Sequence, residues 1–276
     1  MAGKSALRHT VKADFKLGLG LPFLLAILGV SLGFCFDNWE GLKNSINNPL
    51  IYQEGSVTCI MYYFFNSFSF GGMFSTYFAA IMAAIPYACS YCQEENGGMS
   101  IYKVSRCGWK AYVRSKFFVA SMLGGLTLFL GGLLFILALG TYLPIVTPGK
   151  LFESDWIPYY KALAYKNGAL YLVIVLYISF LDGALWGSVG LCASAFIPSS
   201  YVAVCAPFVF RFVLVQIGRL LKLSDGMRLD RLLTARGKIY SDSVTLIVTT
   251  VAVLALIFLC CHLFSKRVER RIWNVE

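Results

Sequence analysis

Long apolar stretches alternate with short polar segments along most of the chain. About 20 apolar residues in a helix are enough to cross the hydrocarbon core of a bilayer. The pattern therefore predicts an all-α polytopic membrane protein with six transmembrane helices, folded as a single domain over residues 1–276. The predicted spans are Leu17–Phe36, Gly72–Tyr91, Phe117–Leu143, Ala169–Phe196, Tyr201–Ile217 and Ser243–Phe264.

Residues 1–16, before the first span, combine basic and apolar positions at helical spacing. The basic positions, four residues apart, are Lys4, Arg8, Lys12 and Lys16. Leu7, Val11 and Phe15 form an adjoining apolar stripe. This pattern predicts an amphipathic interfacial helix on the inner membrane surface. The apolar run that follows is longer than that of a signal peptide and lacks a small-residue cleavage site, so we expect an uncleaved first span.

The central polar segment, residues 93–116, lies between two long uncharged runs. Its charged residues are Glu94, Glu95, Lys103, Arg106, Lys110, Arg114 and Lys116. Gly97 and Gly98 interrupt it, and Met99–Arg114 then mixes apolar and basic positions as a surface helix does. Two interpretations remain open. The segment is an ordinary basic cytoplasmic loop, or it is a docking helix that receives force from a soluble subunit.

The distribution of lysine and arginine predicts the orientation of the chain. With six spans, both termini and the central segment are cytoplasmic, and residues 218–242 form an extracellular re-entrant or interfacial segment. Residues 218–242 are strongly basic, and lysine and arginine are usually concentrated on the cytoplasmic side. The charge count therefore argues against an extracellular position for this segment. If residues 201–217 only dipped into the membrane, this segment would be inside and the C-terminus outside. The length of residues 201–217 allows a full crossing when flanking basic side chains reach the headgroups.

Composition narrows the possible functions. The net charge of +10 would suggest nucleic acid in a soluble protein, but here the basic residues flank apolar spans. Anionic lipid headgroups are therefore the expected partner, and no nucleic acid is expected. The chain contains no G-x-x-x-x-G-K-[ST] loop and no Ser/His/Asp or Cys/His arrangement. We expect neither an enzyme nor a cofactor or metal site in this chain.

Asp182 and Arg211 are ionisable residues inside predicted spans, where charged side chains are costly and are usually paired or functional. Counted from the turn near Pro198, the two lie at similar depths, so they are predicted to meet across the hairpin. A structural ion pair and a polar patch on a transport path are both consistent with this position. Arg211 could instead reach the outer headgroups.

Several short motifs together indicate a family. Glu94-Glu95-Asn96-Gly97-Gly98 is followed by Ser105-Arg106, and Tyr112-Val113-Arg114-Ser115-Lys116 leads into the third span. A short hairpin at Pro198 joins the fourth and fifth spans. With the basic amphipathic N-terminus and six spans, this layout resembles the membrane subunits of ABC exporters of the ABC-2 permease type. The resemblance covers essentially the full chain.

In that family, the loop after the second span contains a coupling helix that sits in a groove of the ATPase subunit. The resemblance therefore assigns ATPase coupling to a group of residues in the central segment. These are Glu94, Glu95, Gly97, Gly98, Tyr102, Arg106 and Trp109. It also implies a second permease subunit, in a homodimer or heterodimer, with ATP and Mg bound by the partner ATPase.

The expected function is export of a peptide or hydrophobic substrate across a cell membrane, in particular a bacterial cytoplasmic membrane. A stand-alone secondary transporter is one alternative, but such proteins are built from internal repeats, and no convincing repeat relates residues 1–145 to residues 146–276. A non-transporting membrane scaffold or immunity protein is another alternative. A neighbouring gene for a soluble ATPase would favour the exporter.

Overall fold

The computed structural model describes residues 2–47, 59–69, 72–145 and 160–273, and the regular structure within these ranges is helical. The predicted all-α class is therefore confirmed. In the described ranges, four helices are long and apolar enough to cross a membrane, and α1 with α2 would count as a fifth if the bent pair is one span. The four are α8 (Trp109–Leu139), α10 (Gly168–Phe196), α11 (Ser200–Leu220) and α13 (Asp242–Trp273). These helices indicate a membrane protein.

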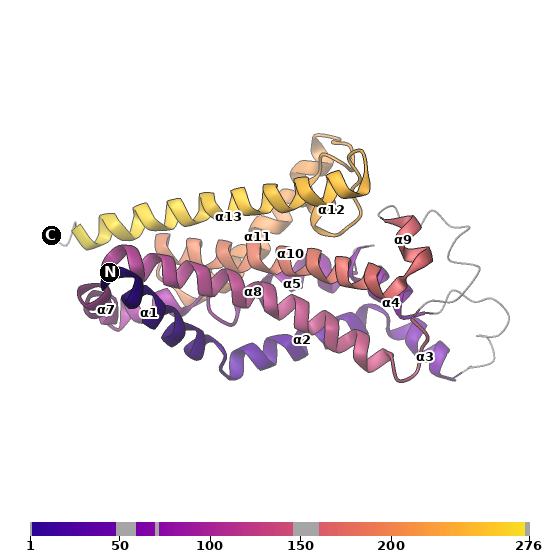
Figure 1. The fold of residues 1–276 in the computed structure, drawn as a ribbon, viewed down its shortest axis with the longest axis horizontal. Coiled ribbons are helices and arrows are strands. Elements are labelled where there is room, and N and C mark those ends of the chain that lie inside the picture. Colours follow the sequence, from indigo (N-terminus) through magenta and orange to yellow (C-terminus); the bar gives the residue numbers. More distant parts are fainter. Residues whose placement is uncertain (1, 48–58, 70–71, 146–159, 274–276) are drawn as a thin grey trace.

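The remaining helices are shorter, and they connect or flank the long ones (Figure 1). They are α1 (Ala2–Gly18), α2 (Leu21–Asp37), α3 (Trp39–Asn47), α4 (Ile60–Phe68), the π-helix η2 (Phe74–Phe78), α5 (Ala79–Ala84), α6 (Ser90–Asn96), α7 (Met99–Cys107), α9 (Lys161–Lys166) and α12 (Leu229–Leu233).

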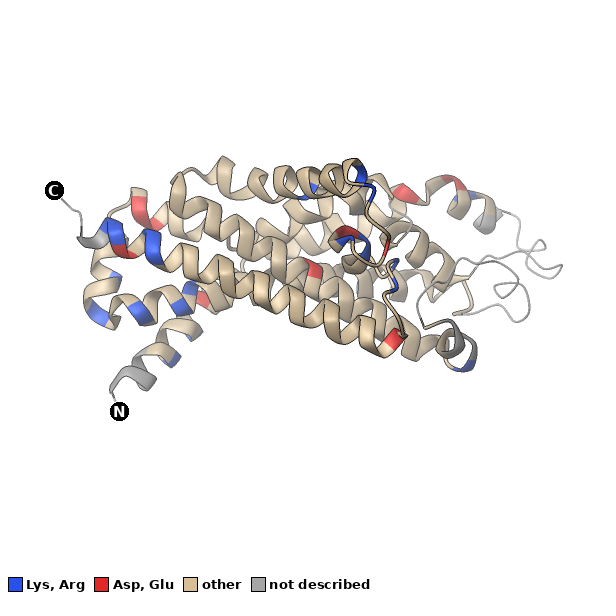
Figure 2. Cartoon of the chain, turned by 90° about the horizontal axis from the view of Figure 1, so that it is seen from above, with Lys and Arg blue, Asp and Glu red and all other residues tan. Residues whose placement is uncertain are grey.

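The long helices run roughly along one axis of the molecule (Figure 1). Both termini lie at one end of this axis, together with α7 and the start of α1, whereas α3 and α9 lie at the other end. Lysine and arginine gather at the end that carries the termini (Figure 2). A second group of charged residues lies part way along the axis.

Helices α8 and α10 form the centre of the bundle, because glycines bring their backbones close together. A Cβ atom built on Gly124 of α8 would lie 2.5 Å from the carbonyl oxygen of Gly183 in α10. One built on Gly187 would lie 2.7 Å from the carbonyl oxygen of Ala120. Small residues permit such close crossings between membrane helices. Gly124 is therefore a point of close packing between α8 and α10.

Outward faces of several helices are apolar. Leu24, Leu28 and Leu32 of α2 are each about half exposed or more, and Val251 and Phe258 of α13 are exposed as well. Apolar side chains on the outside of a bundle are stable in contact with lipid tails but not with water. This pattern supports the membrane assignment independently of helix length.

The first predicted span differs from the structure. Instead of one helix from residue 17 to residue 36, α1 and α2 meet at a bend of 57° around residues 19 and 20. Gly20 is the N-cap of α2, and Pro22 lies in its first turn. Proline lacks the N–H needed inside a helix but is tolerated at a helix start, so a new helix begins here. The predicted helix before this span is present as α1, and its membrane location remains a prediction.

The second predicted span, Gly72–Tyr91, is not one continuous helix. It consists of η2, α5 and α6, with a turn over residues 85–89 between α5 and α6. Pro86 lies in this turn, and proline removes a backbone hydrogen bond and clashes with the preceding helical turn. The break brings the Tyr87 side chain into the polar cluster described below.

The other spans agree better with the structure. Helix α10 matches the predicted fourth span within one residue, and α11 is longer at its C-terminal end than residues 201–217. Helix α8 begins eight residues before the predicted third span. Residues 93–116 are consequently not a loop, because they contain most of α6, all of α7 and the start of α8.

Residues 218–242 include the end of α11 and the short helix α12. Leu233 of α12 packs with Leu181 and Leu185 of α10 and Val253 of α13 in one buried cluster. Leu232 and Leu233 are therefore buried against the protein, whereas Leu220 and Leu221 are exposed.

Candidate functional site

Helix α7 is a separate short element at the end of the bundle that carries the termini (Figure 1). Gly98 at its N-cap has φ 67° and Gly108 at its C-cap has φ 80°, values that glycine adopts without a steric penalty. These two glycines allow the chain to turn sharply on both sides of α7. The predicted docking helix Met99–Arg114 is therefore too long: α7 ends at Cys107, and Trp109 begins α8.

The outer face of α7 is exposed and partly apolar. Met99, Ile101 and Tyr102 are 57%, 62% and 70% exposed, and Arg106 is also exposed. The opposite side contains the buried Ser100 and the half-buried Lys103. An apolar and basic face on a short, well-defined helix is suited to contact with another protein.

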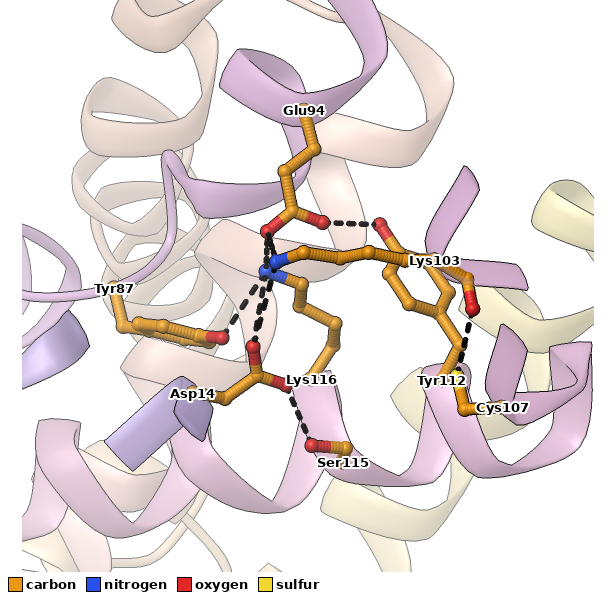
Figure 3. Close-up of polar contacts among 8 residues, drawn as sticks. All are labelled: Asp14, Tyr87, Glu94, Lys103, Cys107, Tyr112, Ser115 and Lys116. Carbon is orange, nitrogen blue, oxygen red and sulfur yellow. Dashed lines mark hydrogen bonds and ion pairs between the residues drawn. The ribbon is translucent and has the colours of Figure 1, made fainter. Parts of the chain in front are cut away.

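Behind α7, a cluster of polar side chains joins four helices (Figure 3). Lys103 of α7 places its Nζ 2.6 Å from Oε1 of Glu94 in α6. The Nζ of Lys116 in α8 lies 2.5 Å from the same oxygen, and the Tyr112 hydroxyl donates to the other carboxylate oxygen at 2.9 Å. Glu94 therefore accepts hydrogen bonds from α7 and α8 at once.

Lys116 lies at the centre of the cluster and is fully buried. Its ammonium also donates to the Tyr87 hydroxyl at 3.1 Å and lies 4.9 Å from the centre of the Tyr87 ring. A buried ammonium is strongly unfavourable unless it is paired and hydrogen-bonded. Lys116 satisfies this requirement with groups from several elements, so its position depends on how those elements pack.

Asp14 connects α1 to the same cluster. Its Oδ1 lies 3.7 Å from Nζ of Lys116 and 3.9 Å from Nζ of Lys103, and its Oδ2 accepts a hydrogen bond from the Ser115 hydroxyl at 2.5 Å. Two carboxylates thus face two ammonium groups inside the bundle. Helices α1, α6, α7 and α8 are fastened together at this point, which we call the polar cluster.

The electrostatics keep Glu94 ionised. Burial raises the pKa of its carboxyl, but Lys116, Lys103 and the Tyr112 hydroxyl together outweigh burial, and the pKa lies below its usual value. Hydrogen bonds to the ionised carboxylate lower its pKa, and the two nearby positive charges lower it as well. The carboxylate is therefore a stable ionic link at neutral pH.

The coupling residues predicted from the sequence lie in four different settings. Glu94 is buried in the polar cluster, whereas Tyr102 and Arg106 lie on the exposed side of α7. Glu95 points elsewhere, 3.9 Å from a guanidinium nitrogen of Arg271 near the C-terminus. Gly97 caps α6.

Sequence reasoning did not select Asp14, Tyr87, Lys103 or Lys116 as site residues. One signal was available, because Asp14 is the only acidic residue among the first 36 and is surrounded by basic residues. Its partners, however, are distant in the sequence. Their meeting depends on the packing of α1 against α8.

The second predicted site lies deeper in the bundle. Arg211 of α11 donates to Asp182 of α10 over 2.7 Å, and the indole N–H of Trp186 donates to the other carboxylate oxygen over 2.7 Å. Both charged side chains are almost fully buried. The structure therefore brings together the two residues that the depth argument paired. In the part of the chain that is described, no three His, Cys, Asp or Glu side chains are grouped as metal ligands would be.

A comparison of the chain with family models, curated proteins and solved structures finds no match. The functional interpretation therefore depends on the geometry of this chain and on the family resemblance of its sequence motifs.

Proposed function

We propose that this chain is the transmembrane subunit of an ABC-type exporter of the ABC-2 permease kind. It crosses the membrane six times, with both termini and α7 in the cytoplasm, and moves a peptide or hydrophobic substrate out of the cell. A separate ATP-binding subunit, which holds ATP and Mg, drives it. A second permease subunit, identical or homologous, completes the pathway in a bacterial cytoplasmic membrane.

The observation that carries the proposal is the combination of an exposed face on α7 with the polar cluster behind it. Met99, Ile101 and Tyr102 offer a docking surface, and Lys103 connects α7 through Glu94 to α8. A displacement of α7 by a bound ATPase would move α1, α6 and the start of α8 as one unit. Because α8 packs closely on α10, such a movement would reach the centre of the bundle.

The coupling role predicts a specific double-mutant phenotype. Replacing Tyr102 and Arg106 by Ala is expected to leave the protein folded, because both side chains are exposed. The partner ATPase should still hydrolyse ATP, but transport should fall about tenfold or more, as expected for the loss of two central contacts of an interface. Vesicle transport and ATPase activity, measured on the same preparation, test this.

Arg8→Ala is a matched control, because Arg8 is an exposed basic residue in the first half of α1. It should leave both activities close to those of the wild type. Full transport by the Tyr102/Arg106 double variant, with unchanged copurification of the ATPase, would rule out α7 as the docking helix.

The interruption between α5 and α6 favours one alternative function. Secondary transporters place discontinuous helices around a substrate site, and residues 85–89 form such a break. A stand-alone transporter of this kind would move its substrate with an ion gradient and without ATP. Transport by the purified chain alone in ATP-free vesicles would favour this alternative over the exporter.

A further inference from the structure

An apolar groove of about 770 Å³ lies among the long helices. It is lined mostly by side chains of α10, α11 and α13 (Figure 1), and α12 with the residues before it lines the remainder. Its described lining residues belong neither to α7 nor to the polar cluster. Small-molecule sites in proteins usually measure about 300–1,000 Å³. The groove is therefore large enough to hold a ligand.

The groove follows α10 over a considerable length. Leu185 and Phe196 are the first and last residues of α10 that line it, and they lie about 16 Å apart along the helix at about 1.5 Å per residue. The hydrocarbon core of a bilayer is about 30 Å thick. The groove thus runs along about half of this core, the depth that one hydrocarbon chain of a single leaflet occupies.

Few polar side chains line the groove, and the strongly polar ones already have partners. The indole N–H of Trp186 donates over 2.7 Å to the buried carboxylate of α10 described above. Arg228 donates to both carboxylate oxygens of Asp230, over 3.2 Å and 2.7 Å. Cys192 and Cys260 contribute thiols, which are weak hydrogen-bonding groups.

The groove also has no net charge. Among the described residues, Arg228 and Asp230 are its only charged lining side chains, and they form an ion pair at 2.7 Å. Both are largely buried. A charged ligand would therefore find no counter-ion here, and burying an unpaired charge is strongly unfavourable. The groove suits an uncharged molecule.

The exporter proposal leaves two substrate classes, a peptide and a hydrophobic molecule, and the groove discriminates between them. An extended peptide rises about 3.3 Å per residue, so about five residues would occupy the length along α10. Each residue brings one N–H and one C=O that need partners when they are buried, about ten groups in all. The described side chains of the groove cannot supply these partners, whereas a hydrocarbon chain needs none.

We propose that the groove binds the hydrocarbon chain of an uncharged, long-chain, lipid-like molecule. Arg228 and Asp230 offer polar contacts to its small polar head. In the proposed exporter such a molecule is the transported substrate, and to this extent the inference rests on the proposed function. The binding itself requires neither α7 nor an ATPase.

Photolabelling of the full chain in phosphatidylcholine nanodiscs tests the proposal, because bilayer chains then compete for the groove. One probe is hexadecanol with a diazirine on its chain, and the other is an acetylated and amidated apolar pentapeptide that contains photoleucine. We expect hexadecanol to label groove residues, and an excess of unlabelled hexadecanol to suppress this labelling. The pentapeptide should label them at least about tenfold less, the factor expected when one buried backbone group stays unpaired.

A pair of matched variants locates the labelling. Val213→Trp fills the groove from α11, because Val213 lines it, and should lose the suppressible labelling. Val173→Trp is the control, since Val173 is an exposed valine of α10 outside the groove, and it should label as the wild type does. Should Val213→Trp fail to fold, Ala193→Trp fills the groove from α10 and gives the same comparison.

Three results would overturn the proposal. The first is groove labelling that unlabelled hexadecanol does not suppress, which would show ordinary contact with the bilayer only. The second is equal labelling by the pentapeptide. The third is an equal loss of labelling in Val213→Trp and Val173→Trp.

The ATPase activity of the assembled exporter separates this inference from the exporter proposal. Hexadecanol should stimulate ATP hydrolysis in the wild type and in Val173→Trp but not in Val213→Trp. Equal stimulation in the two variants would remove the groove from the substrate path and leave the exporter intact. Suppressible labelling of a chain with which no ATPase copurifies would support the groove and count against the exporter.

Discussion

Replacing Glu94 by Gln is expected to destabilise the protein by about 3–5 kcal/mol, the usual cost of removing one partner from a buried ion pair. The substitution keeps the size of the side chain but removes the charge that faces two ammonium groups. Lys116 would remain fully buried, with Asp14 3.7 Å away as its remaining acidic partner. The free energy of unfolding in detergent, measured with a chemical denaturant, tests this prediction.

Glu95→Gln provides the matched control, because it is the same change one residue further along the chain. The Glu95 side chain is partly exposed, and its nearest guanidinium nitrogen is 3.9 Å away. Exposed pairs of this kind contribute about 0–1 kcal/mol. Equal losses of unfolding free energy in the two variants would show that Glu94 contributes no more to stability than a partly exposed carboxylate.

The same carboxylate predicts a pH dependence. Burial of Glu94 opposes ionisation, but its positive neighbours outweigh burial and its pKa is lowered. Its contribution to stability is therefore present above the unfolded-state pKa of about 4.3 and is lost as the pH falls through the folded-state pKa. The stabilities of the wild type and Glu94→Gln should converge below about pH 4. A difference that persists unchanged to lower pH would contradict this.

Replacing Asp182 by Asn is expected to cause a loss of similar size, about 3–5 kcal/mol. The amide oxygen of the new side chain can still accept a hydrogen bond from the Trp186 N–H. The loss of unfolding free energy therefore comes mainly from the uncompensated charge of the buried Arg211. Adding Arg211→Gln should recover part of the stability, because the buried charge is then absent. Unfolding free energies of the two single variants and the double variant give the coupling energy.

Asp225→Asn is a control for this cycle, because its side chain is largely exposed and lies 3.8 Å from Arg231. It should cost less than about 1 kcal/mol. Additive losses in the Asp182/Arg211 double variant would show that the two residues are not coupled energetically.

The helix that was predicted most accurately is apolar along nearly its whole length and free of proline. Residues 168–196 contain no proline and no charge except Asp182, and the prediction for α10 was correct within one residue. The second span was wrong because an uncharged stretch was interpreted as one helix although Pro86 interrupts it. Hydropathy reports the preference for lipid, whereas the break depends on the backbone chemistry of one residue.

The candidate site could be predicted only in part. Its location in the central segment follows from the charge pattern, and the family resemblance selected Tyr102 and Arg106, which the structure places on the exposed side of α7. The burial of Lys116 does not follow from the sequence, because its partners Asp14 and Glu94 come from other helices. A basic residue beside an apolar span usually indicates the headgroup region, and the packing of α1 gives this one a different environment.

The most direct test of the exporter proposal is photocrosslinking from α7 in living cells that also express a candidate ATP-binding subunit. A photoreactive phenylalanine analogue would replace Tyr102 in one strain and Tyr240, another exposed tyrosine before α13, in a second strain. We predict a crosslink to a soluble subunit from position 102 alone, with mass spectrometry of the product identifying a nucleotide-binding sequence. If the ATPase copurifies with the chain but crosslinks equally from both positions, or from position 240 alone, α7 is not the coupling helix.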